Sequence, residues 1–285
     1  MRRFLLGISL LSLLLSACDS PFPPRNLVER LRPLAVKASP PECGLSDQVE
    51  LEALVADPQG QGRTLSFNWA LCIVELDSAA SDIACPGPDS YPLPGQGASS
   101  SLSMPELLDW LMEKGYDLDP EQWPEGEEMP EDISLFVGFE VSAGEEMMRG
   151  VKRIKLRLDG TSGDNENPRL EGLEMDGVAV EDAVLQIPAG AQVVMAPLVD
   201  ESSRDTYIPD GESETQVEDF VFSWFCSAGE FEEDKTILDT DSEGRRLDTN
   251  VFKAPLEPGP VTVWLVVRDA RFGTDWMSWQ VEILE

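Results

Sequence analysis

The sequence predicts an all-β protein built from two tandem β-sandwiches, the first with a short helical insertion. Three observations favour this fold class. Apolar and polar residues alternate with a period of two in many short segments, which is the pattern of half-buried strands. Residues that form turns, mainly Pro, Gly, Asn and Asp, separate these segments. The order of segments then repeats, with Trp69 and Trp224 in matching places, 224 − 69 = 155 positions apart.

The first sandwich is expected over residues 31–158. Its strands are predicted where the alternation is clearest: Leu34–Ala38, Val49–Val55, Leu65–Leu71, and a closing hairpin of Ile133–Val141 with Val151–Leu158. Prolines and glycines such as those at Asp57–Gly60 mark the turns between them.

An insertion around residues 78–132 interrupts this alternation. Its start is rich in Ser, Gly and Pro, and its centre predicts one short helix over Met104–Gly115. Ser103 suits the N-cap, Pro105 the first turn and Gly115 the end. An apolar stripe at helical spacing, expected to dock on the sandwich's own sheet, is formed by Leu107, Leu108, Leu111 and Met112.

A polar, turn-forming stretch at residues 159–168 predicts the linker between the two domains. The second sandwich is expected over residues 169–285 and repeats the plan of the first. Its strands are predicted at Val184–Ile187, Val193–Val199, Phe220–Cys226, Val261–Val267 and Trp276–Ile283.

This plan resembles the immunoglobulin-like and PKD-like domains of bacterial surface proteins. The resemblance rests on three segments, Leu65–Trp69, Phe220–Trp224 and Val261–Asp269. It implies that Trp69 and Trp224 are packed between the sheets. The turn at Asp57–Gly60 departs from the acidic turn of calcium-binding relatives, so the sequence leaves calcium binding open and assigns no metal ligands.

The first residues have the plan of a secretory signal peptide, which we assign to residues 1–17. Arg2 and Arg3 precede the apolar run Phe4–Leu15. That run is shorter than the roughly 20 residues that a membrane-spanning helix needs. Leu15-Ser16-Ala17-Cys18 follows immediately and resembles the lipobox of bacterial lipoproteins.

The lipoprotein resemblance implies that Cys18 receives a diacylglyceryl group, that the leader is cut just before it, and that the new amino terminus is acylated. Two or three acyl chains hold a protein stably on a membrane, whereas one holds it reversibly. We therefore expect a lipid-anchored protein of the bacterial cell envelope, on the inner or the outer membrane. A proline-containing tether is expected over residues 18–30.

The charge and composition exclude several classes of function. The formal net charge is −33, with 54 acidic and 21 basic residues, which disfavours nucleic acid as a partner. The chain has no His, which removes Ser–His and Cys–His catalysis and imidazole metal ligands. No cofactor is expected.

Four cysteines besides Cys18 lie in the part of the chain that is expected to be exported. Cys72 and Cys85 flank a loop-like stretch and are predicted to form a disulfide. Cys43 and Cys226 fall in different domains, where they are either free and buried or joined to each other. No Cys-x-x-Cys spacing that would indicate zinc is present.

One candidate ligand patch remains, formed by Trp264, Trp276 and Trp279 near the end of the chain. Trp264 is out of phase with its apolar neighbours, so it faces either solvent or the other domain. The predicted function is a structural or interaction role without chemistry, with an unidentified envelope protein or polymer as partner. The alternatives are a carbohydrate- or peptide-binding module and a carboxylate-based hydrolase.

Overall fold

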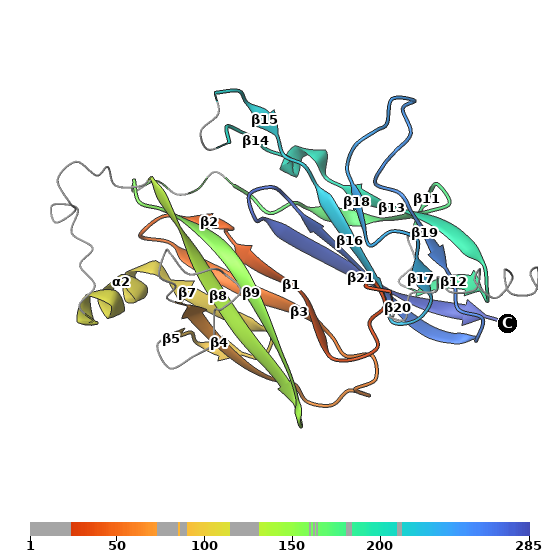
Figure 1. Cartoon of the computed structure of the whole chain (residues 1–285), viewed down its shortest axis with the longest axis horizontal. Helices are drawn as coiled ribbons and strands as arrows, with labels where there is room; N and C mark the ends of the chain where they lie inside the picture. Colours follow the sequence, from red (N-terminus) through yellow and green to blue (C-terminus); the bar gives the residue numbers. More distant parts are fainter. Residues whose placement is uncertain are drawn as a thin grey trace, which may run out of the picture.

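The computed structural model describes residues 24–72, 85, 90–114, 131–159, 161, 163, 165–180, 184–209 and 213–285. Two β-sandwiches lie side by side in this part of the chain, the first containing strands β1–β9 and the second containing β10–β21 (Figure 1). Each has its own apolar core between two sheets. The predicted fold class, two tandem immunoglobulin-like sandwiches with a short helix in the first, is confirmed.

The first sandwich consists of one sheet of four strands and one of five. The four-stranded sheet has the order β1 (Arg32–Ser39), β3 (Gln48–Ala56), β7 (Ser99–Ser103) and β6 (Gly95–Gln96). The five-stranded sheet has the order β2 (Glu42–Cys43), β9 (Glu146–Arg157), β8 (Asp132–Ala143), β4 (Ser66–Cys72) and β5 (Tyr91–Pro92).

The second sandwich consists of two five-stranded sheets. One has the order β11 (Val178–Ala179), β10 (Leu170–Met175), β13 (Gln192–Val199), β19 (Asn250–Lys253) and β17 (Glu230–Phe231). The other has the order β12 (Val184–Pro188), β21 (Thr274–Leu284), β20 (Gly259–Arg268), β16 (Val221–Cys226) and β18 (Lys235–Ile237). A one-turn 3-10 helix η3 (Glu201–Ser203) and the small ribbon of β14 (Thr206–Tyr207) and β15 (Gln216–Val217) lie outside both sheets.

The two sandwiches share one strand order. β2 pairs in parallel with β9, which closes a hairpin with β8, and β8 pairs with β4. In the second sandwich β12 pairs in parallel with β21, β21 with β20, and β20 with β16. The repeated segment order in the sequence therefore corresponds to repeated topology.

The two matching tryptophans occupy the two cores. Trp69 is 2% exposed and donates its indole N–H to the carbonyl oxygen of Gly97 at 3.1 Å. Trp224 is fully buried and donates to Thr236 Oγ1 at 2.9 Å. Each large ring thus fills the space between the sheets while its one polar group is satisfied.

The helical insertion contains α2 (Met104–Glu113), which begins where the sequence predicted. Ser103 is the N-cap, and its hydroxyl accepts from the N–H of Glu106 at 3.5 Å. Met104 and Leu107 are buried against the first core. The expected stripe was wrong at Met112, which is 59% exposed. Five residues beyond Leu107 at 100° each, Met112 lies well off the buried face.

The closing hairpin of the first sandwich is longer than predicted. The sequence placed a connecting turn at residues 142–150, but pairing continues to Ala143 opposite Glu146. Gly144 has φ of 63°, a conformation that glycine adopts without strain, and it allows the tight turn. Met147 and Met148 are exposed, so this end of β9 lacks the alternation that marks a half-buried strand.

Candidate functional site

Cys18, the predicted lipidation site, lies outside the described residues. The structure places Cys72, at the end of β4, in a disulfide with Cys85, with the two Cα atoms 5.6 Å apart. Both cysteines pack with Ala70 and Phe136 in a small cluster on the outer face of the β4–β8 sheet. The bond fastens one point of the insertion to the end of β4 in the first sandwich.

Cys43 and Cys226 do not bridge the sandwiches, because each is a free and buried thiol. Burial raises the pKa of Cys43 to about 12, and the charges of Asp47 and Glu42 add to this. Burial raises the pKa of Cys226 to about 12, with a further contribution from Glu230. The thiolate is the reactive form, so neither cysteine is suited to act as a nucleophile.

The three tryptophans of the candidate patch do not form one exposed surface. Trp279 is 7% exposed and belongs to the second core. Trp264 is 8% exposed and packs against the first sandwich instead of facing solvent. Trp276 is half-buried, with the Lys37 ammonium 5.4 Å from its ring centre. The strand pairing explains this split, because Trp264 and Trp276 share one face of the β20–β21 hairpin and Trp279 has the other.

The two sandwiches contact each other along one region, where β1 and β9 face β20, β21 and the turn at residues 269–273. We call this region the interdomain seam. β1 runs beside β21 there (Figure 1). An apolar cluster at the seam joins both sandwiches and consists of Val28, Leu34, Ala56 and Trp264, with Leu54 and Phe225 packed against it. Burial of these side chains favours a fixed arrangement of the two domains.

Residues 26–28, which precede the first strand, contact the second sandwich. Leu27 forms a parallel bridge with Cys226, at the end of β16. Val28 donates its N–H to the carbonyl oxygen of Cys226 at 2.8 Å, and Cys226 donates to the carbonyl of Asn26 at 2.9 Å. The Asn26 amide also donates to the carbonyl of Phe231 at 2.9 Å. Part of the segment expected to be a free tether is therefore bound to the second domain.

Polar contacts also cross the seam. Lys37 on β1 forms an ion pair with Asp275 on β21 at 2.9 Å, and Arg268 donates to the carbonyl oxygen of Leu34 at 2.8 Å. Asn167, from the predicted linker, contacts both sandwiches. Its amide donates to the carbonyl of Ala38 at 2.8 Å, and its oxygen accepts from the N–H of Thr274 at 2.8 Å.

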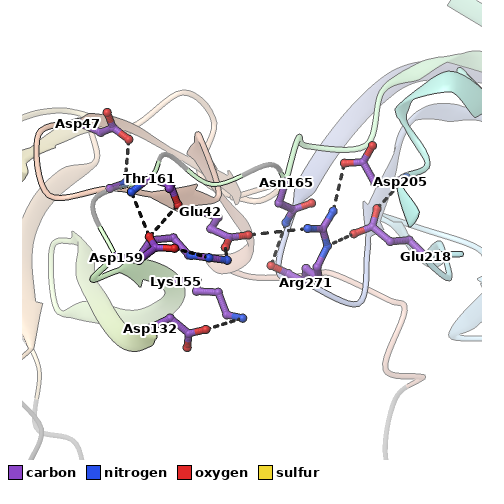
Figure 2. Close-up of polar contacts among 12 residues, drawn as sticks. Glu42, Asp47, Asp132, Lys155, Asp159, Thr161, Asn165, Asp205, Glu218 and Arg271 are labelled. Carbon is purple, nitrogen blue, oxygen red and sulfur yellow. Dashed lines mark hydrogen bonds and ion pairs between the residues drawn. The ribbon is translucent and has the colours of Figure 1, made fainter. Parts of the chain in front are cut away.

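Arg271 is the centre of an ionic network in the seam (Figure 2). Its guanidinium contacts three carboxylates, Glu218 at 2.6 Å, Asp205 at 3.1 Å and Glu42 at 3.8 Å. Glu42 belongs to the first sandwich, and its side chain also contacts Arg157 at 3.5 Å. Glu218 is fully buried, so Arg271 is the cation that balances its charge.

A cavity of about 350 Å³ opens beside this network. β1 contributes one wall, the β8–β9 hairpin a second, and the end of β20 with its following turn a third. The polar residues that line it are Arg149, Lys152, Arg153, Arg268, Asp269 and Thr274. The apolar residues that line it include Pro33, Leu34, Val36, Phe139, Val151 and Phe272.

Lys152 is the most unusual group in this cavity. It is 6% exposed, and its ammonium donates to the carbonyl oxygen of Phe272 and to Thr274 Oγ1, the latter at 3.0 Å. Burial lowers the pKa of Lys152 to about 7; Asp269 acts against this shift and Arg268 adds to it. Both hydrogen-bond acceptors belong to the second sandwich, so the lysine also ties the domains together.

Asp269 lines the same cavity, and only one of its two carboxylate oxygens has hydrogen-bond partners. Its Oδ1 accepts the N–H groups of Gly273 at 2.7 Å and Arg271 at 2.8 Å, whereas Oδ2 is buried without a hydrogen-bond partner. Burial raises the pKa of Asp269 to about 6, helped by the nearby charge of Glu218. The carboxyl group is therefore close to half protonated at mildly acidic pH.

These groups do not form a recognisable catalytic arrangement. A lysine that activated Thr274 as a nucleophile would have to accept the hydroxyl proton. Here the hydroxyl accepts from Lys152 and lies 3.4 Å from the carbonyl oxygen of Phe272. Thr274 is also only 2% exposed. The arrangement offers positive charge and hydrogen-bond donors, which suits binding of an anion.

Sequence periodicity could not reveal this site, because its residues come from segments more than a hundred positions apart. One local signal was present. Five of the 21 basic residues lie between positions 149 and 157, namely Arg149, Lys152, Arg153, Lys155 and Arg157. Five basic residues so close together in an acidic chain indicate a positively charged surface or site.

Two features are absent from the described residues. In these ranges no helix has the length and apolarity to cross a bilayer. Nor do the same ranges contain a group of three or more Cys, Asp or Glu side chains placed to hold a metal ion.

No protein-family model and no curated protein sequence matches the chain. Among solved structures, the D0–D1 domains of intimin align over 89% of this chain and 99% of theirs, with 10% identity and a TM-score of 0.25. The tandem V-type regions of VCBP3, a v-region-containing chitin binding protein, align over 88% and 99%, with 10% identity and a TM-score of 0.31. The adhesin InvE of Yersinia pseudotuberculosis aligns over 90% of this chain and 61% of its own, with 11% identity and a TM-score of 0.24. The immunoglobulin-like fold of this chain is seen in its own strand order.

Proposed function

We propose that this chain is a lipid-anchored protein of the bacterial cell envelope, whose paired sandwiches have a structural or protein-interaction role without chemistry of their own. The observation that carries the proposal is the sequence Leu15-Ser16-Ala17-Cys18 directly after the apolar run Phe4–Leu15. Small residues before a cysteine suit cleavage there, and the thiol is the atom to which the lipid is joined.

The bound N-terminal segment limits how far the protein stands from its anchor. From Cys18 to Asn26 is 26 − 18 = 8 residues, which span at most roughly 29 Å when fully extended. Asn26 is held on the second sandwich, so that domain would lie close to the bilayer. A net charge of −33 disfavours direct contact with anionic headgroups, which leaves membrane binding to the lipid.

The seam supports a structural role. An apolar cluster, the ion pair of Lys37 with Asp275 and the Arg271 network all join the two sandwiches. A pair of domains held in this way presents its loops in a fixed geometry. The partner would be another envelope protein or a surface polymer.

Metabolic labelling with palmitate tests the anchor. We expect the wild-type protein to carry the label and to fractionate with membranes, and the Cys18→Ala variant to carry none and to be released. The Cys226→Ala variant is the matched control, since it also loses one cysteine, and it should keep the label. A labelled Cys18→Ala protein would contradict the proposal.

A further inference from the structure

The seam cavity concentrates positive charge in a chain that is otherwise strongly acidic. Four basic side chains line it, Arg149, Lys152, Arg153 and Arg268, against one acidic side chain, Asp269. The whole sequence has the opposite balance, with 54 acidic and 21 basic residues. An acidic protein has many carboxylates with which to neutralise such groups, so cations left facing a cavity indicate that something else meets them.

Lys152 is buried and Arg268 is half-buried, and both have only neutral hydrogen-bond partners. Lys152 donates to the carbonyl of Phe272 and the hydroxyl of Thr274. Arg268 donates to the carbonyl of Leu34 and, at 3.3 Å, to Ser223 Oγ. Neither forms an ion pair with any described residue. Removing a charge from water without a paired counter-ion is unfavourable. Burial accordingly lowers the pKa of both groups, with Asp269 opposing part of the shift at Lys152.

The other two cations, Arg149 and Arg153, are exposed, so water solvates their charge. Arg149 pairs with Glu140 at 3.1 Å. Arg153 donates to Ser134 Oγ at 2.7 Å and lies over the Phe272 ring, 4.4 Å from its centre. The unmet demand for negative charge therefore falls on Lys152 and Arg268.

The remaining walls of the cavity are largely apolar, with Leu34, Val36 and Phe272 among them. Its volume of about 350 Å³ is in the lower part of the range of small-molecule sites. A fully hydrated inorganic anion would leave this apolar surface unused. A carboxylate attached to a short hydrocarbon group would satisfy both the cations and the walls.

We propose that the seam cavity binds the carboxylate of a small amphipathic acid, which pairs with Lys152 and Arg268 while its hydrocarbon part packs on Leu34, Val36 and Phe272. The carboxylate comes either from a free organic acid or from the C-terminus of an apolar peptide. Because the ligand touches β1, β9 and β20, it would also fasten the two sandwiches together. This site does not depend on the anchor at Cys18.

Two titrating groups set the pH dependence of binding. Lys152, whose pKa burial lowers to about 7, attracts a carboxylate only while it is protonated. Asp269, whose pKa burial raises to about 6, repels the ligand once it is ionised. Arg149, Arg153 and Arg268 are the other charged groups that line the cavity. Affinity should therefore be greatest near pH 6 and fall as the pH rises to 9.

Isothermal titration calorimetry on the full-length protein in a nonionic detergent tests the proposal at pH 6. Hexanoate is the probe, and neutral hexanamide is its matched comparison. We expect hexanoate to bind at least roughly tenfold more tightly than hexanamide. The affinity for hexanoate should fall roughly tenfold or more in the Lys152→Met variant, in the Arg268→Gln variant, and in the wild-type protein at pH 9. Arg245→Gln, which removes an exposed arginine elsewhere, should change nothing.

The source of the carboxylate is decided by a second titration with an apolar tripeptide and its C-terminally amidated form. Tighter binding of the free-acid peptide than of hexanoate assigns the site to chain ends, and the reverse assigns it to small acids. Equal binding of hexanoate and hexanamide, no binding of either, or tighter binding of inorganic phosphate would overturn the proposal. If Lys152→Met does not fold, the amide comparison and Arg268→Gln still decide it.

Discussion

Replacing Arg271 by alanine would remove the cation that three carboxylates share in the seam. Glu218 is fully buried, whereas Asp205 has a side chain that is 33% exposed. Glu42 would keep Arg157 at 3.5 Å. The loss therefore falls mainly on Glu218, which would retain the N–H of Asp205 at 3.2 Å but no counter-ion.

The expected size of the effect follows from that burial. Removing one partner of a buried ion pair typically costs about 3–5 kcal/mol, because a charge is left uncompensated. For a domain of the size of the second sandwich, that corresponds to a fall in Tm of roughly 12–20 °C. Glu218→Gln in the Arg271→Ala background removes the stranded charge, so the double variant should lose less than the sum of the two single changes.

Chemical denaturation followed by tryptophan fluorescence measures this effect, since Trp224 reports on the second core. Arg245→Ala is the matched control: its partner Asp241 is at the surface and the arginine side chain is 73% exposed, so it should change the free energy of unfolding by no more than about 0.5 kcal/mol. A loss below about 1 kcal/mol for Arg271→Ala, or strictly additive single and double variants, would refute the reasoning.

Two other predictions concern the first sandwich and the seam. Cys72→Ser should lower the free energy of unfolding of the first sandwich by about 3 kcal/mol, because the disulfide closes a loop with a sequence separation of 13. A reductant should destabilise the wild-type protein by the same amount and leave the variant unchanged. A wild-type protein whose stability does not respond to reductant would count against this role of the disulfide. Burial lowers the pKa of Lys152 in the folded protein from 10.5 to about 7. Between these two pH values the unfolded chain binds more protons than the folded protein, so the free energy of unfolding should rise with pH across that window. Lys152→Met should abolish that rise in urea midpoints measured from pH 7 to pH 10, and parallel profiles for the two proteins would exclude the mechanism.

Much of the fold could be predicted from alternation alone. Strands with one face in a core, such as β3, show strict alternation of exposed and buried residues over Gln48–Ala53. The shortest strands had no such signal, because β2 contains only Glu42 and Cys43 and β11 only Val178 and Ala179. These strands are defined by their pairing partners and not by any local pattern.

The candidate site was largely beyond prediction, for a related reason. Trp264 was expected to face either solvent or the other domain, and only the packing of Leu34 and Ala56 against it settles which. The cavity brings Lys152 to Thr274 across 122 positions. Sequence periodicity carries information on the faces of a strand but none on which faces meet between domains.

The pairing of residues 26–28 with the end of β16 has a consequence for the order of folding. The contact between Asn26 and Cys226 spans 200 positions of the chain. A nascent chain therefore holds this early segment unpaired until β16 has been synthesised and has formed its sheet, and contacts of such long range form slowly. Completion of the second sandwich would thus be the step that immobilises the start of the folded chain.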